Sequence, residues 1–264
     1  GDPDRAESLV RVGLQRGPAG AEASGGGHPR GWSRLVFEFA ALLSERGSPA
    51  EAQALLADLV RSLQRELPDR HALIVDARAL LARTSLNLGD LAGAERTLRE
   101  NMAAIAERPE DLGALDRSLV SRIDLHRRSG NAAGVAAALE QLVRARGERR
   151  GSESHPDVLR VRIELAAERQ SEHRDPPSGA EIATLRDLLT DVQVGCGPAS
   201  LQSARANELL AVAFERSGAL DGAYRHARMA LEIAQRHGGW LPEARRIVAE
   251  GKGDRTAGGP AGGG

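Results

Sequence analysis

The sequence contains very few cysteines, lysines and aromatic residues. Cys196 is the only cysteine among 264 residues, which excludes a disulfide within the chain and a zinc site made of several cysteines. Aromatic residues make up 2% of the chain, whereas hydrophobic residues make up 41%. The apolar content is therefore mostly Ala, Leu and Val, which fill closely packed helices better than sheets. The lone thiol is typical of a reducing compartment, and we expect a cytoplasmic location.

Long apolar runs and a large net charge are absent as well. No apolar stretch approaches the roughly 20 residues needed to span a bilayer, so we expect no membrane insertion. The formal net charge is -1, and a balanced charge creates no field that would attract nucleic acid. No segment alternates apolar and polar residues over a sustained length, which argues against sheet.

Motifs of catalysis and of metal binding are also missing. The triplet His173-Arg174-Asp175 matches the start of a kinase catalytic loop, but Ala180 stands where that loop needs a metal-binding Asn. The seven histidines form no pair four residues apart, and such a pair is the usual helical zinc arrangement. We therefore expect no catalytic residue, no metal site and no cofactor.

A repeat organises most of the chain. A helix-like stretch ends in a glycine turn, and a small residue follows five positions later, with a period of roughly 41–46 residues. The glycine and the small residue are Gly47 and Ala52, Gly89 and Ala94, and Gly218 and Ala223, with Gly130 and Val135 as a near match. Prolines recur with the same period and suit the first turn of a helix; they are Pro29, Pro68, Pro109, Pro156 and Pro198.

Each unit of the repeat predicts two antiparallel helices. The first helices are expected at 33–46, 69–88, 112–129, 156–172 and 199–217, and the second helices at 49–66, 90–107, 132–148, 178–193 and 221–237. Ser48-Pro49-Ala50-Glu51 predicts a capping box at the start of one second helix. The fourth unit has an irregular turn, because Pro176 and Pro177 stand in place of the glycine.

These residues resemble the tetratricopeptide repeat (TPR). Ala40, Ala82 and Ala211 lie seven residues before the turn glycines, at positions where the repeat needs small residues. The long period and the His28-Pro29 and His155-Pro156 openings look like the kinesin-light-chain variant, which is also common in bacterial signalling proteins. The resemblance implies an all-α fold, a right-handed α-solenoid of helix pairs whose first helices line a concave groove. It also implies a signalling role, with a kinase or signalling ATPase elsewhere in a larger bacterial protein.

The same resemblance assigns groove positions on the first helices. We expect the groove to be lined by Phe37, Arg83, Asn87, Asp124, Arg127, Arg128, Glu164, Glu168 and Glu208. The surface would run from basic in the middle repeats to acidic beyond them. The alternative is that these residues are solvated helix faces with local ion pairs.

The predicted organisation has four parts. Residues 1–16 are expected to be the second helix of an incomplete leading repeat and 17–31 a flexible linker. Residues 32–250 would form about five helical pairs with a C-terminal capping helix, and 251–264 a disordered tail. Trp32 and Trp240 lie at opposite ends of the array, where each is expected to seal an apolar face, and Trp240 could alternatively serve an interface.

The pattern therefore predicts a non-catalytic protein–protein interaction scaffold that binds a peptide or a partner protein on its concave face. An alternative function is a self-associating structural module, in which open repeat ends stack between chains. Both interpretations exclude nucleic acid as the partner.

Overall fold

The computed structural model describes residues 30–108, 110–173 and 175–257. This part of the chain contains eleven α-helices and no strand, so the predicted all-α solenoid class is confirmed. The predicted helix at 1–16 and nearly all of the linker at 17–31 lie outside the described residues. The helices form two compact units, which divide between Asn131 and Ala132.

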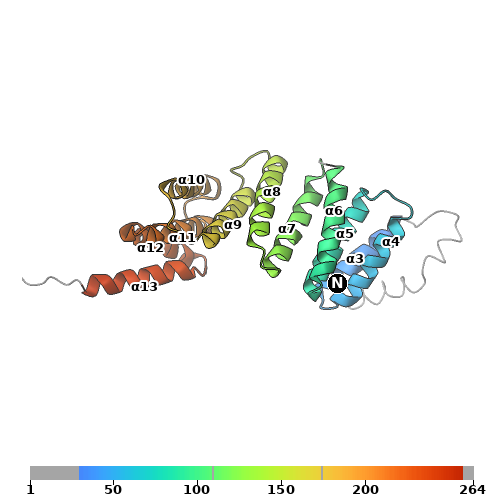
Figure 1. The fold of residues 1–264 in the computed structure, drawn as a ribbon, viewed down its shortest axis with the longest axis horizontal. Coiled ribbons are helices and arrows are strands. Elements are labelled where there is room, and N and C mark those ends of the chain that lie inside the picture. Colours follow the sequence, from blue (N-terminus) through green and yellow to red (C-terminus); the bar gives the residue numbers. More distant parts are fainter. Residues whose placement is uncertain (1–29, 109, 174, 258–264) are drawn as a thin grey trace, which may run out of the picture. The chain divides into compact units, whose positions relative to one another are not determined.

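The first unit contains α3 (Arg30–Glu45), α4 (Pro49–Leu63), α5 (Ala72–Leu88), α6 (Leu91–Ala106) and α7 (Leu112–Arg128). Each helix packs against the next one in the chain (Figure 1). The first helices of successive repeats also touch, since α5 contacts both α3 and α7. This is the pattern of a solenoid, in which each pair buries its apolar face against its neighbours.

The second unit contains α8 (Ala132–Arg150), α9 (Pro156–Glu172), α10 (Gly179–Cys196), α11 (Leu201–Arg216), α12 (Leu220–Arg236) and α13 (Pro242–Ala257). Here α11 contacts α9, α10 and α12, and α13 contacts α11 and α12. Helix α13 thus contacts both helices of the preceding pair, α11 and α12, just as α11 contacts both helices of its preceding pair, α9 and α10. It occupies the position of a first helix in a further repeat.

Glycines with positive φ end four of the first helices. The φ angles are +89° at Gly47, +78° at Gly89, +68° at Gly130 and +79° at Gly218, a left-handed conformation that glycine adopts without steric cost. The small residues on either side are buried where helices cross closely, with no exposed surface at Ala40, Ala52, Ala82, Ala94 and Ala211 and 1% at Ala223.

Two of the predicted helix starts need correction. The Ser48 side chain makes no capping hydrogen bond, so the capping box predicted there is wrong. The capping box lies instead at Ser178 and Glu181, at the start of α10. Helix α5 begins at Ala72 rather than at 69, because the imidazole of His71 accepts the Leu73 N–H at 3.2 Å and sets the N-terminus.

The ends of the array also differ from the prediction. Helix α3 begins at Arg30, inside the predicted linker, and α13 continues past Glu250 to Ala257. Trp240 is 68% exposed, so its predicted sealing role is wrong. Its ring instead lies under the Arg245 guanidinium, 4.0 Å away, and buried residues of α13 fill the core in its place. Trp32 is half-buried against an apolar cluster formed by α3, α4 and α5.

Candidate functional site

In the second unit, the adjacent first helices α9 and α11 border a hollow of about 410 Å³, which we call the inner hollow. Two of the predicted groove residues, Glu164 and Glu208, line it together. The apolar part of its surface comes from Ile163, Ala167, Leu201 and Leu209, and two arginines, Arg160 and Arg205, complete the charged part. The inner hollow therefore offers an apolar surface with both signs of charge around it.

Glu208 also stabilises the last helix. Its carboxylate accepts a hydrogen bond from the backbone N–H of Ala244, with 3.2 Å between the atoms, in the first turn of α13. Carboxylates are favoured there because N–H groups at a helix N-terminus lack partners within the helix. Burial raises the pKa of Glu208, and the backbone N–H groups of Ala244 and Glu243 oppose that rise. Glu208 is thus a helix cap that also faces the inner hollow.

The third predicted glutamate, Glu168, lies outside the residues that line the inner hollow. Its side chain is half-buried on α9. Its neighbour Arg169 pairs with Glu140 of α8 at 2.7 Å. The structure therefore brings two of the three predicted glutamates into one hollow.

In the first unit, Arg128 holds two helices together. Its guanidinium donates to the backbone carbonyl of Leu86 at 2.5 Å, which joins the end of α7 to the end of α5. It also pairs with the Asp124 carboxylate at 3.1 Å. Arg128 and Asp124 therefore form a local ion pair, as the alternative interpretation of the groove residues expected. The hydrogen bond to Leu86 gives Arg128 a structural role as well.

The other predicted residues of the first unit differ in exposure. Arg83, Asn87 and Arg127 are exposed, and Phe37 is half-buried between two apolar clusters with Arg34 over its ring at 5.6 Å. Within the described residues, the side chains of Arg83 and Asn87 have no hydrogen bond or ion pair. The proposed basic-to-acidic gradient joins residues of both units and stays a prediction.

The irregular turn of the fourth repeat is held by Arg216, a residue at a groove position of the fifth repeat for which the sequence predicted no structural role. Arg216, at the end of α11, donates to the backbone carbonyls of Gln170 at 2.7 Å and Asp175 at 2.6 Å, and also to that of His173. Arg216 and Arg128 both lie two residues before a turn glycine. This shared position in the repeat is the sequence signal for the role, because both arginines donate to a backbone carbonyl of the preceding first helix.

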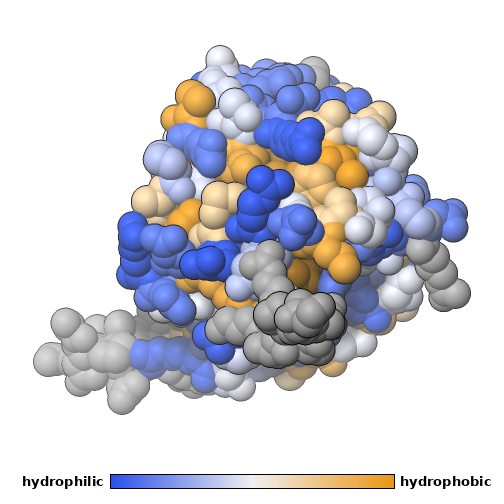
Figure 2. Space-filling view, turned by 90° about the vertical axis from the view of Figure 1, so that its left-hand side faces the viewer, coloured by the Kyte–Doolittle hydropathy of each residue, from blue (hydrophilic) through white to orange (hydrophobic). Residues whose placement is uncertain are grey.

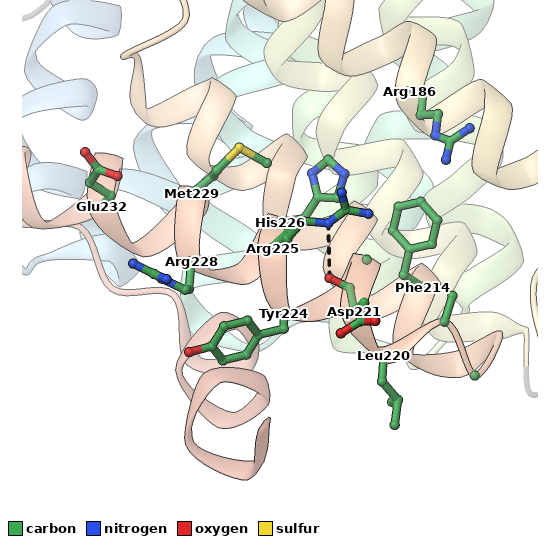
Figure 3. Close-up of a pocket in the computed structure, with 13 residues that line it drawn as sticks. Arg186, Phe214, Leu220, Asp221, Tyr224, Arg225, His226, Arg228, Met229 and Glu232 are labelled. Atoms are coloured by element: carbon green, nitrogen blue, oxygen red, sulfur yellow. Dashed lines mark hydrogen bonds between the residues drawn. The ribbon is translucent and has the colours of Figure 1, made fainter. Parts of the chain in front are cut away.

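A second hollow in this unit lies over α12, and we call it the outer hollow (Figure 3). Its floor is a stack in which Arg186 lies 5.2 Å from the Phe214 ring and the ring of His226 lies parallel to Phe214 at 5.4 Å. The buried Asn207 donates its amide to the Ser203 carbonyl, so its oxygen accepts from His226 Nδ1 at 2.9 Å. Burial lowers the pKa of His226, helped by Arg225 and Arg186.

The described part of the chain shows neither a cluster of metal ligands nor a cysteine with a lowered pKa. Within the described ranges, no three His, Cys, Asp or Glu side chains cluster as metal ligands would. Burial raises the pKa of the Cys196 thiol, which keeps it in its less nucleophilic protonated form. Among the described helices, none combines the length and the apolar character of a membrane span.

Comparison with known proteins identifies the fold. The sequence matches no protein-family model and no curated protein. Among solved structures, a kinesin light chain with nearly identical TPR-like repeats from Podosopora anserina is 20% identical, with 77% of this chain and 96% of that chain covered and a TM-score of 0.59. BtubC (BKLC) from P. vanneervenii is 15% identical, with 90% and 91% covered and a TM-score of 0.61.

Proposed function

We propose that this chain, which has the TPR-like fold of those kinesin-light-chain-related structures, is a non-catalytic scaffold that binds a peptide of a partner protein. The inner hollow between α9 and α11 is the observation that carries the proposal. First helices of adjacent repeats border it, and solenoids present binding surfaces along such rows of equivalent helices. A kinase or signalling ATPase in the same protein and a bacterial origin belong to this proposal as the wider context.

The chemistry of the inner hollow favours a particular type of peptide. Leu201 and Leu209 are half-buried and Ala167 is exposed, so an apolar peptide side chain gains buried area there without displacing a core residue. Arg205 and Glu164 place one charge of each sign in the lining of the hollow. We therefore expect a peptide with one apolar anchor flanked by charged residues, bound with its backbone extended along α9 and α11.

A substitution that fills the inner hollow tests the proposal. Ala167→Trp places a large ring in the hollow from an exposed position, and Ala183→Trp places the same ring on an exposed face of α10 as a matched control. Peptides would be selected by phage display against the full chain and measured by fluorescence anisotropy. We expect affinities on the order of micromolar, weakened roughly tenfold or more by Ala167→Trp and unchanged by Ala183→Trp.

The proposal fails if no peptide is enriched, or if selected peptides bind the Ala167→Trp variant as tightly as the unchanged chain. The selected peptides could also bind in a way that depends only on residues of the first unit. In that case the binding site would not be the inner hollow.

A further inference from the structure

The outer hollow is larger than the inner one and is made by different helices. Its volume is about 1120 Å³, against about 410 Å³ for the inner hollow. Arg186 of α10 borders one side, the turn before α12 borders another, and α12 supplies most of the remaining lining. Helices α10 and α12 do not contact each other, so the second helices of the fourth and fifth repeats leave this space between them.

Three arginines of the outer hollow have no acidic partner. Arg186, Arg225 and Arg228 are exposed, and within the described residues none of the three forms an ion pair. Arg225 and Arg228 are three residues apart on α12, where like charges repel each other. A bound carboxylate would relieve this repulsion.

The three arginines outnumber the two acidic residues of the outer hollow, Asp221 and Glu232. Glu232 pairs with Arg236 at 2.9 Å, outside the hollow's lining. The backbone carbonyl of Asp221 accepts a hydrogen bond from Arg225 Nε at 3.3 Å (Figure 3). The charge of the hollow is therefore positive, although the chain as a whole carries -1.

Exposed apolar side chains lie in the same hollow. Leu220 is 61% exposed and Met229 is 43% exposed, and both line it. Figure 2 faces the end of the second unit, where hydrophobic residues are exposed in patches between hydrophilic ones. Met is flexible and adapts to different apolar partners. A ligand that fits must therefore combine negative charge with apolar groups.

We propose that the outer hollow binds an acidic, amphipathic peptide segment of a partner protein. Its carboxylates meet Arg186, Arg225 and Arg228, whose planar guanidiniums bind carboxylates in bidentate geometry. Its apolar side chains lie on Leu220 and Met229. Nucleic acid fits less well, because the exposed apolar side chains of Leu220 and Met229 offer no partner to a phosphate backbone. This is a second binding site, independent of the inner hollow.

The two methionines of the chain allow a direct test. Met229 lies in the outer hollow and Met102 lies on α6 of the first unit, so labelling both ε-methyl groups with ¹³C gives one reporter and one internal control. The probe is the peptide Glu-Leu-Glu-Glu-Leu-Leu-Glu-Glu, and its matched control replaces each Glu by Gln. We expect the acidic peptide to shift the Met229 signal saturably and leave the Met102 signal in place.

Charge reversal then links the shift to the arginines. The double variant Arg186→Glu and Arg228→Glu should weaken binding of the acidic peptide by roughly tenfold or more. Arg96→Glu with Arg144→Glu, at exposed arginines outside the hollow, should leave it unchanged. Ala167→Trp should leave it unchanged too, which separates this site from the inner hollow. Circular dichroism checks that every variant keeps its helical content.

Several outcomes would overturn the proposal. One is an equal shift of Met229 by the Gln peptide, and another is unchanged affinity in the double variant. Tighter binding of a single-stranded RNA of mixed sequence through the same arginines would assign the hollow to nucleic acid. A dimer by light scattering that becomes a monomer in the double variant would assign it to a second copy of the chain.

Discussion

The guanidinium of Arg216 lies 2.7 Å from the backbone carbonyl oxygen of Gln170, although the two residues are 46 positions apart in the chain. Arg128 and Leu86 repeat this contact at 2.5 Å across 42 positions. Both separations match the period of the repeat. In each case the last turn of one first helix donates to the end of the preceding first helix, where carbonyl groups have no partner within the helix.

Loss of Arg216 should loosen the irregular turn of the fourth repeat. Arg216→Ala removes hydrogen bonds to the carbonyls of Gln170, His173 and Asp175, and we expect a loss of about 1–2 kcal/mol because bonds from a charged donor are the stronger ones. Hydrogen exchange should show faster opening around residues 170–178. Arg144→Ala, at an exposed arginine of α8, is the control. Equal exchange in both variants would contradict a structural role for Arg216.

Arg128 and Arg83 should behave differently although both were predicted to line the groove. Arg128→Ala should lower the free energy of unfolding by about 1 kcal/mol, because it removes one of the two hydrogen bonds to the Leu86 carbonyl and the ion pair of Asp124. Arg83→Ala should change it by less than about 0.5 kcal/mol, as is usual for exposed residues without partners. Guanidinium denaturation followed by circular dichroism measures both. A larger loss for Arg83 would reverse this assignment.

Glu208 should make the stability depend on pH near its raised pKa. The folded chain binds the Glu208 proton more tightly than the unfolded chain does, because burial raises the pKa. Stability from this group is therefore full below the unfolded pKa of about 4.3 and is lost as the pH rises through the folded value. Glu208→Gln keeps an acceptor for the Ala244 N–H and removes the charge.

For that reason, the melting temperature of Glu208→Gln should equal or exceed that of the unchanged chain at neutral pH, and the difference should shrink as the solution becomes acidic. Thermal melts at several pH values measure this. The opposite result is a Glu208→Gln variant that melts below the unchanged chain at neutral pH and matches it at acidic pH. That result would contradict a raised pKa of Glu208.

Two glycines in helices should respond to alanine with opposite signs. A Cβ at Gly222 would lie 3.0 Å from the Phe214 ring, whereas a Cβ at Gly179 would meet nothing within 4 Å. Overpacking should make Gly222→Ala destabilising by about 1–3 kcal/mol. Gly179→Ala should be neutral or stabilising by up to about 1 kcal/mol, because alanine is the better helix former. Thermal melts measure both, and a stabilising Gly222→Ala would show that α11 and α12 are not held this closely.

The sequence by itself determined the repeat, the helices and the turns. A left-handed turn at Gly89 or Gly218 needs glycine, and a close helix crossing needs a small residue such as Ala82 or Ala211. Both requirements act on residues that are close in sequence. The helix bounds follow from the same local signals, and they fall within about one turn of the predicted ranges.

Only the tertiary structure decided what the charged residues do. Whether Arg128 faces a ligand or the Leu86 carbonyl, and whether Glu208 is free or caps α13, depends on helices that lie a repeat away in the chain. The outer hollow arises because α10 and α12 stay apart over α11, which no local pattern records. Charged side chains are long and find partners by distance in space, so their roles emerge only after the repeats are stacked.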